Sequence, residues 1–309
     1  MHVPVLLKET LEYLNAASGG RFADGTVGSG GHTIAILNSN PVNQVLGIDL
    51  DQTSLDKLRE RLVQESLNQR ATLVKGNYVD LDSICAEHSI TELDGILLDL
   101  GFSSDQVDQA KRGFSFQSEG PLDMRFDSSS KVTAEQVVNH YHVHELAEIF
   151  KDFGEEKFAG RIAREIVAHR QKGSILSTGQ LAEIIKQALP KPIQFKAADS
   201  QRRIFQALRI EVNRELVNLK TVLPKCLKLL KPAGRLVVIS FQSLEDRIVK
   251  EFFNEQAREC VCPPEFPTCV CDKISTLRIL TRKPATASEE EIKTNSRSKP
   301  AKLRAAQKI

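Results

Sequence analysis

A glycine-rich loop and a single acid end two consecutive apolar stretches near the start of the chain. The first stretch enters the loop Asp-Gly-Thr-Val-Gly-Ser-Gly-Gly-His at residues 24–32, and the second ends at Asp49. Gly28, Gly30 and Gly31 let backbone amides and a helix N-terminus approach a ligand, while an acid after a second strand accepts hydrogen bonds from ribose hydroxyls. The pattern predicts a nucleotide-type pocket at the carboxyl ends of two parallel strands.

The residues that follow the glycines narrow the choice of ligand. No Lys-Ser or Lys-Thr pair follows them, which excludes a phosphate-gripping P-loop. Thr33 stands where the dinucleotide pattern carries its third glycine, which disfavours a pyrophosphate-binding loop. A glycine-rich turn that binds nothing stays open as the structural alternative.

Strand and helix patterns alternate over the first hundred residues, with strands expected at 21–24, 45–49, 71–75 and 93–98. Strands separated by helices imply right-handed crossovers and therefore a parallel sheet. In such sheets ligands bind outside the carboxyl ends of the strands, where this chain places Asp24, Asp49, Tyr78 and Asp99.

This succession of groups favours S-adenosylmethionine over NAD. An aromatic side chain after the third strand, Tyr78, suits an adenine face, and an acid after the fourth, Asp99, suits the reacting end of the ligand. NAD usually needs a second mononucleotide-binding half, which the sequence lacks. The alternatives are that Tyr78 packs on the sheet rim and that Asp99 caps a helix.

The alternation breaks after about residue 104 and resumes near residue 200. Helical patterns fill the gap, at 132–150, 155–169 and 178–189. Beyond it we expect a long helix at 203–230, a strand at 235–241, a helix at 244–257 and an antiparallel strand at 277–281. The expected parts are a first sheet segment at 1–104, an inserted helical substrate-recognition domain at 105–200, a second sheet segment at 201–285 and a basic C-terminal tail at 286–309.

Composition and charge point to an ordinary globular protein with a polyanionic partner. The chain has 309 residues, 41% of them hydrophobic, and a net charge of +2. Its start lacks the layout of a signal peptide and no apolar run is long enough for a membrane span, so we expect a cytoplasmic protein with no membrane partner. Residues 160–214 hold eleven Lys or Arg and four Asp or Glu, and six cations but no acids follow Glu291. These basic stretches predict a nucleic-acid partner, with solvated helix faces as the alternative.

Several longer segments together resemble the bacterial RsmH (MraW) family of 16S rRNA cytosine-N4 methyltransferases. The likeness runs nearly end to end. It covers residues 2–9, 24–32, 97–101, 103–104, 106, 112–116, 120–125, 205–210, 212–213 and 243–250. The resemblance implies an α/β class I S-adenosylmethionine-dependent methyltransferase (Rossmann-like) sheet with an inserted all-helical domain, which agrees with the interrupted pattern above.

The same resemblance implies the reaction, the cofactor and the residues that bind it. A methyl group would pass from S-adenosylmethionine to N4 of a decoding-centre cytidine in the 16S rRNA of the small ribosomal subunit. The positions that match the family's cofactor contacts are Gly30, Gly31, His32, Asp49, Tyr78, Asp99 and Gln106. Three residues depart from the family pattern: Phe102 replaces a small aliphatic residue, Asp105 a proline and Gln242 a histidine.

Asp99 is the expected catalytic residue, with a backbone carbonyl of residues 99–101 as the alternative acceptor. The exocyclic amine of cytosine is a poor nucleophile, and an acceptor beside it would stabilise the positive charge that develops on nitrogen. The base must also leave its stack, and Phe102, Phe114 and Phe116 are available to cover it, unless they anchor the insertion. Candidates for binding RNA phosphates are Arg112, Arg125, Arg202, Arg203 and Arg209.

Two further patterns are not assigned to function, and two rival functions stay open. Cys260, Cys262, Cys269 and Cys271 could hold zinc, but Cys-x-Cys is not the usual Cys-x-x-Cys knuckle, and no metal site is predicted. The histidines at 140, 142 and 144 are expected on an exposed helix face.

The rivals are a catalytically weakened RNA-binding or ribosome-assembly factor on the same fold and a nicotinamide-dependent oxidoreductase. The oligomeric state, monomer or homodimer, is open.

Overall fold

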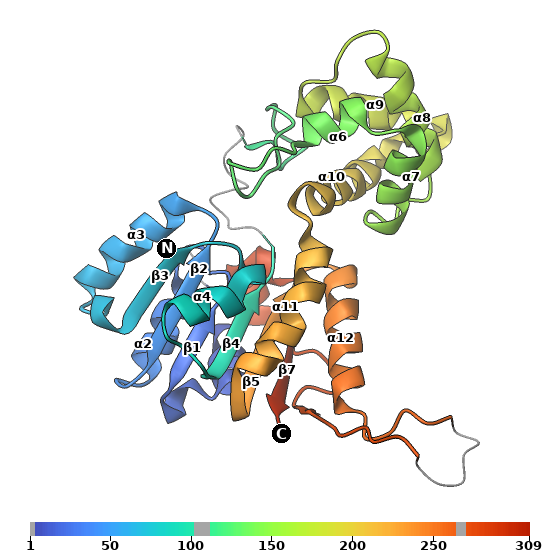
Figure 1. Ribbon diagram of the computed structural model, residues 1–309. Helices are drawn as coiled ribbons and strands as arrows, with labels where there is room; N and C mark the ends of the chain where they lie inside the picture. Colours follow the sequence, from blue (N-terminus) through green and yellow to red (C-terminus); the bar gives the residue numbers. More distant parts are fainter. Residues whose placement is uncertain (1–3, 102–111, 264–269) are drawn as a thin grey trace. The chain divides into compact units, whose positions relative to one another are not determined.

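The computed structural model describes residues 4–101, 112–263 and 270–309 (Figure 1). The chain forms two compact units. One combines Met1–Gly101 with Leu216–Ile309, and the other spans Phe102–Glu215. We call them the sheet unit and the helical unit and describe each by itself.

The sheet unit is built on seven strands in the order β3-β2-β1-β4-β5-β7-β6. The strands are β1 Arg21–Asp24, β2 Gln44–Asp49, β3 Ala71–Lys75, β4 Leu93–Asp99, β5 Leu230–Ser240, β6 Leu277–Ile279 and β7 Lys302–Lys308. Strands β1 to β5 are parallel, whereas β7 runs antiparallel to both of its neighbours. The predicted parallel sheet is therefore confirmed. The strand expected at 277–281 is β6, which pairs antiparallel with β7 but runs in the same direction as β1 to β5, so the strand opposed to the rest of the sheet is β7.

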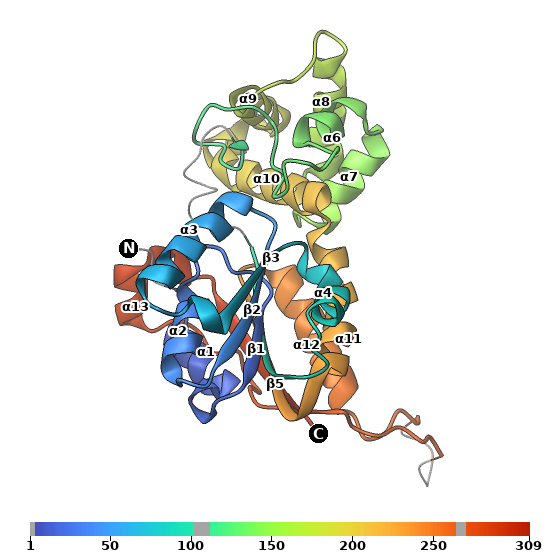
Figure 2. The ribbon, with the colours of Figure 1, turned by 60° about the vertical axis from the view of Figure 1, so that its left-hand side comes forward.

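Helices cover both faces of this sheet (Figure 2). One face carries α1 Leu7–Leu14, α2 Gly31–Ser39 and α3 Gln52–Gln64, and the other carries α4 Leu81–Glu87, α11 Glu215–Leu229 and α12 Ser243–Ala257. Alternate residues of β4 serve the two cores: Leu97 packs under α1 to α3, and Ile96 and Leu98 pack under α4, α11 and α12. A strand buried on both faces explains the continuous apolar run in the sequence.

The segment that the sequence interpretation treated as a basic tail, 286–309, contains α13 Glu289–Thr294 and strand β7. β7 lies between β5 and β6, so it is an interior strand of the sheet. Two of its cations bind an acid: Arg304 donates to both carboxylate oxygens of Asp246 in α12, and Lys302 Nζ lies 3.5 Å from the same group. Part of the basic charge in this segment is thus neutralised inside the unit.

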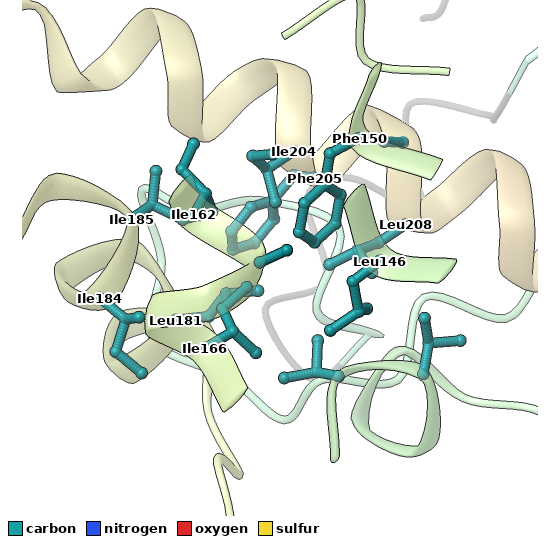
Figure 3. Close-up of a cluster of buried hydrophobic side chains, with 14 of the residues drawn as sticks. Leu146, Phe150, Ile162, Ile166, Leu181, Ile184, Ile185, Ile204, Phe205 and Leu208 are labelled. Atoms are coloured by element: carbon teal, nitrogen blue, oxygen red, sulfur yellow. The ribbon is translucent and has the colours of Figure 1, made fainter. Parts of the chain in front are cut away.

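The described part of the helical unit contains α6 Ala134–His140, α7 Val143–Asp152, α8 Ala159–Arg170, α9 Thr178–Ala188 and α10 Ala197–Asn213. Figure 3 shows the apolar core that these helices share, in which Phe150, Ile166, Leu181 and Phe205 are buried. No strand occurs among the residues described in this unit, in line with the predicted helical insertion.

Two helices expected to be continuous are broken. The expected helix at 132–150 is split, and His142 caps the second piece through a hydrogen bond from its amide to Glu145. The expected helix at 203–230 ends at Asn213, because Arg214 takes a left-handed conformation with φ 52° before α11 begins. Asn213 also donates to Met124 O and accepts from Phe126 N, which fixes the break.

Helix length excludes a membrane span in the described chain: none of its helices is both long enough and apolar enough to cross a bilayer.

Candidate functional site

Two glycines where the loop from β1 enters α2 are packed closely against neighbouring side chains. Gly30 has φ 78°, and a β-carbon there would lie 2.2 Å from Leu58 Cδ1. A β-carbon on Gly31 would lie 2.3 Å from Pro4 Cγ. These glycines bring the loop and the first turn of α2 close against their surroundings, and the N-terminal amides of α2 stay available to a ligand.

The buried Asp24 fixes the conformation of this loop through hydrogen bonds. Its carboxylate is buried and accepts hydrogen bonds from Thr33 Oγ1 at 2.7 Å and from Thr26 N at 3.1 Å. Burial raises the pKa of Asp24 to about 6, although the hydrogen bond from Thr33 acts in the opposite direction. The structure therefore makes Asp24 a residue that positions the loop.

Asp49 joins the second strand to the glycine loop. Its Oδ2 accepts from Gly28 N at 2.7 Å, and its Oδ1 accepts from Asp51 N at 2.8 Å. Burial raises the pKa of Asp49, while these amide hydrogen bonds lower it. The structure thus brings Gly28 and Asp49, two of the predicted site residues, into direct contact.

Tyr78 begins a short 3₁₀ turn, Tyr78–Asp80, directly after β3. Asn77 fixes the entry to this turn, since its side-chain oxygen accepts from Val79 N at 3.1 Å. The half-buried Tyr78 lies against the start of the glycine loop: its Cβ would be 3.1 Å from a β-carbon on Gly25. Its position beside the loop is consistent with the predicted adenine contact.

His32 and Asp99 form an ion pair at the carboxyl end of β4. His32 Nε2 lies 3.5 Å from Asp99 Oδ2, and the His32 side chain is 7% exposed and the Asp99 side chain 24%. Burial alone would lower the pKa of His32, but Asp99, Asp24 and Glu291 together raise it. The pair is anchored through the backbone, because Asp99 N donates to Thr26 Oγ1 at 2.7 Å.

Polar atoms of this pair lack hydrogen bonds although they are buried. Among the described residues, His32 Nδ1, His32 Nε2 and Asp99 Oδ1 have no hydrogen-bonding partner. Buried polar groups are nearly always satisfied in native proteins, and the exceptions need an explanation. A polar ligand at the end of β4 would supply the missing partners.

Glu291 is a neighbour of this site that the sequence did not reveal. It lies in α13, and its Oε1 accepts from Leu6 N at 2.8 Å, just before α1. Its negative charge contributes to the raised pKa of His32. No local motif links residues so far apart in the chain, so only the fold could bring Glu291 toward the glycine loop.

The remaining predicted residues either lie outside the described chain or pack within the helical unit. Gln106, Phe102 and Asp105 lie outside the described residues, so the expected cofactor contact of Gln106 stays a prediction. Phe114 and Phe116 pack against the core of the helical unit, where Phe114 stacks on Phe126 and Phe116 meets Phe205 edge to face. Their anchoring role thus has structural support.

The five candidate arginines all have partners within the chain. Arg112 donates to the carbonyls of Arg125 and Phe126, and the other four form ion pairs. These pairs are Arg125–Asp123, Arg202–Asp199, Arg203–Glu156 and Arg209–Glu215. Arg202 is the most exposed of the four, and an exposed ion pair such as Arg202–Asp199 is weak.

Gln242, the departure from the family histidine, stands at the start of α12. The Glu245 carboxylate accepts from Phe241 N at 3.0 Å and from Gln242 N at 3.3 Å, which satisfies amides that precede the helix. The Gln242 side chain donates to the same carboxylate at 3.0 Å. A neutral hydrogen-bonding residue therefore fits this helix start.

Known proteins similar to this chain extend over its full length. One solved structure is an rRNA methylase from Streptococcus thermophilus. The match covers 100% of this chain and 99% of that protein, with a TM-score of 0.43 and 10% sequence identity. Proteins named ribosomal RNA small subunit methyltransferase H from Halothermothrix orenii and Heliobacterium mobile are 46% and 47% identical to this chain. Both alignments span 100% of this chain and 98% or 99% of the relative. The family model described as the MraW methylase family matches residues 1–309, and the chain belongs to that family.

Proposed function

We propose that the chain transfers the methyl group of S-adenosylmethionine to N4 of a decoding-centre cytidine in the 16S rRNA of the small ribosomal subunit. Its family and its relatives, which are named for small-subunit rRNA methylation, support this function. The observation that carries it is the His32–Asp99 pair beside the glycine loop, whose buried polar atoms have no hydrogen-bonding partner among the described residues. A substrate in the ribosome also implies a cytoplasmic protein.

The described residues fit this cofactor. Asp49 would accept from ribose hydroxyls, Tyr78 would lie on the adenine, and the amides at the start of α2 would approach the ligand. His32 and Asp99 would satisfy their buried polar atoms against its reacting end. The sulfonium of the bound cofactor supplies an activated methyl group, so the residues have only to align the acceptor and exclude water.

Asp99 would act on the acceptor nitrogen. The lone pair of the cytosine amine is delocalised into the ring, and a carboxylate that accepts from this amine favours the pyramidal, nucleophilic geometry. As the amine nitrogen bonds to the methyl carbon, the bond from that carbon to sulfur would break and leave the neutral thioether S-adenosylhomocysteine. The nitrogen would become positively charged and pass one proton to the Asp99 carboxylate. Because Asp99 is held through its own amide by Thr26, its carboxylate would be preorganised for this charge.

We propose that the helical unit recognises the RNA. Its exposed cations include Lys157, Arg161, Arg164, Lys172, Lys191 and Lys196. Phe195 is 78% exposed, and Lys196 Nζ lies 5.4 Å from its ring centroid. Exposed cations beside an exposed aromatic ring are the elements that bind single-stranded RNA, through phosphate contacts and base stacking.

The test is Asp99→Asn, with label transfer from radioactive S-adenosylmethionine to small ribosomal subunits as the measurement. We expect a loss of about 100-fold or more in turnover, because one preorganised charge-stabilising group is removed. Asp56→Asn, at an exposed position of α3, is the matched control for the loss of a carboxylate. Unchanged turnover together with unchanged S-adenosylhomocysteine affinity would show that Asp99 is not the acceptor.

The label-transfer assay and a thermal-shift experiment together separate the rival functions. A non-catalytic assembly factor would bind small subunits without transferring label, and an oxidoreductase would be stabilised by NADH in a thermal-shift experiment. The main sequence argument for a weakened enzyme was Gln242 in place of histidine. Its role at the start of α12 shows a structural use for that residue, which removes support from this rival.

A further inference from the structure

The long connection between α12 and β6 carries the cysteines that the sequence interpretation left without a role. Its described residues, 258–263 and 270–276, form no helix or strand. We propose that Cys260, Cys262 and Cys271 bind a soft divalent metal ion, zinc in the cell, which fixes this connection. The three sulfur atoms all lie within 4.8 Å of one another.

The spacing of the sulfurs fits a metal better than it fits a disulfide. Cys260 Sγ and Cys271 Sγ are 3.7 Å apart. Three thiolates at about 2.3 Å from a tetrahedral zinc ion would have sulfurs about 3.8 Å apart. A disulfide requires a separation of about 2.05 Å, which this pair does not approach.

Backbone amides are directed at these sulfurs. Val261 N donates to Cys271 Sγ, and Val270 N donates to Cys262 Sγ, both at 3.3 Å. Cys262 N donates to Cys260 Sγ, also at 3.3 Å, so the chain turns around the first sulfur. Hydrogen bonds to charged acceptors are the stronger ones, and donors placed this way favour thiolates, the form that binds a metal.

Hydrophobic burial contributes little to the described residues of the connection. Three of their apolar side chains are largely exposed, 56% for Val261, 68% for Val270 and 79% for Ile274. Two hydrogen bonds join the ends of the connection: Thr276 N donates to Gln256 O at 2.9 Å, and Ser275 Oγ donates to Ala257 O. A metal ion bound by cysteines from both ends would order this segment, which hydrophobic burial does not order.

The experiment measures metal in the full-length protein purified under reducing conditions. We expect about one zinc ion per chain, released on titration of the thiols with a mercurial reagent. Replacement of zinc by Co(II) should give a thiolate-to-cobalt charge-transfer absorption and the intense visible bands of tetrahedral Co(II). Cys260→Ser and Cys271→Ser should each lose most of the metal, and their connections should be cut faster by protease.

Val261→Ser is the matched control, because it changes an exposed neighbour of two ligands and keeps all the thiols. It should retain the metal and the cobalt spectrum. All variants keep the buried Cys85 and Cys226, so metal held by these thiols would survive in Cys260→Ser and would contradict the proposal. Zinc below about 0.1 equivalent after anaerobic reconstitution, or a disulfide found by alkylation and mass spectrometry without reductant, would also overturn it.

Discussion

Asp24 shows how a residue of a ligand-binding motif can act on the motif itself. The sequence placed it at a strand end, where ligand contacts occur, and the structure buries it under the loop with Thr26 and Thr33 as donors. Asp49 and Asp99 differ, because each also lies partly open to solvent. Burial therefore separates the acid that shapes the loop from the acids that can reach a ligand.

The raised pKa of Asp24 has a measurable consequence for stability. In the folded protein this pKa is about 6, above its ordinary value of 3.8, so between these values the folded state binds more protons than the unfolded state. The contribution of Asp24 to the free energy of unfolding is then greatest below pH 4 and decreases as pH rises to 6, by about 3 kcal/mol. Asp24→Asn should lack this decrease.

The measurement is urea unfolding of the ligand-free protein and of Asp24→Asn from pH 4 to pH 7, with Asp56→Asn as a control for the lost charge. The difference in free energy of unfolding, wild type minus Asp24→Asn, should fall by about 2 kcal/mol over that range, because the unfolded carboxyl is already about half ionised at pH 4. A difference that stays constant with pH would mean that Asp24 is ionised in the folded protein throughout.

At the scale of elements, α12 begins with a carboxylate that satisfies the backbone before it. Glu245 is only 3% exposed, and Glu245→Ala would leave the amides of Phe241 and Gln242 without this acceptor. We expect a loss of about 2 kcal/mol in the free energy of unfolding, because two part-buried donors lose their acceptor. Chemical denaturation measures it, and Glu251→Ala, exposed on the same helix, is the control. Equal stability of the two variants would contradict this role of Glu245.

The first elements could be predicted from the sequence because their signals are local. The strands expected at 71–75 and 93–98 correspond to β3 and β4, and the glycine loop lies where it was placed. Their apolar runs are bounded by clear turn residues, and such a pattern does not depend on distant parts of the chain. The expected α/β fold with a helical insertion is confirmed on this basis.

The missed elements depend on distant partners. β7 has the sequence Lys-Leu-Arg-Ala-Ala-Gln-Lys, whose charges and alanines give little strand signal. It becomes a strand because β5 and β6 pair with it and Asp246 neutralises Arg304. The break at Arg214 likewise rests on Met124 and Phe126, almost ninety residues earlier. The cysteines were noted as possible zinc ligands but no metal site was predicted for a related reason, since the turn at Cys262 is not visible in a Cys-x-Cys spacing.

At the scale of the whole molecule, the net charge is near neutral, but the sheet unit and the helical unit use their cations differently. The sheet unit carries the proposed cofactor residues and uses Lys302 and Arg304 internally. The helical unit contains the whole basic stretch 160–214, and several of its cations stay exposed. Charge in the helical unit therefore supports the RNA partner better than charge at the C-terminal end of the chain.

Separate apolar cores predict separate unfolding transitions. The core of the helical unit contains residues from Leu122 to Val212 only, and the two cores of the sheet unit contain none of these. Calorimetry should therefore resolve two transitions. S-adenosylhomocysteine should raise the melting temperature of one, the sheet unit, because a ligand stabilises the folded state that binds it.

Two matched core variants assign the transitions. Leu223→Ala, in α11, should lower the transition that responds to S-adenosylhomocysteine, and Ile166→Ala, in α8, should lower the other. Both side chains are almost fully buried, so each loss should be about 2 to 5 kcal/mol, the range found for such truncations. If both variants lower a single transition that the ligand shifts as a whole, the two units unfold as one, and the ligand or the chain between them couples their stabilities.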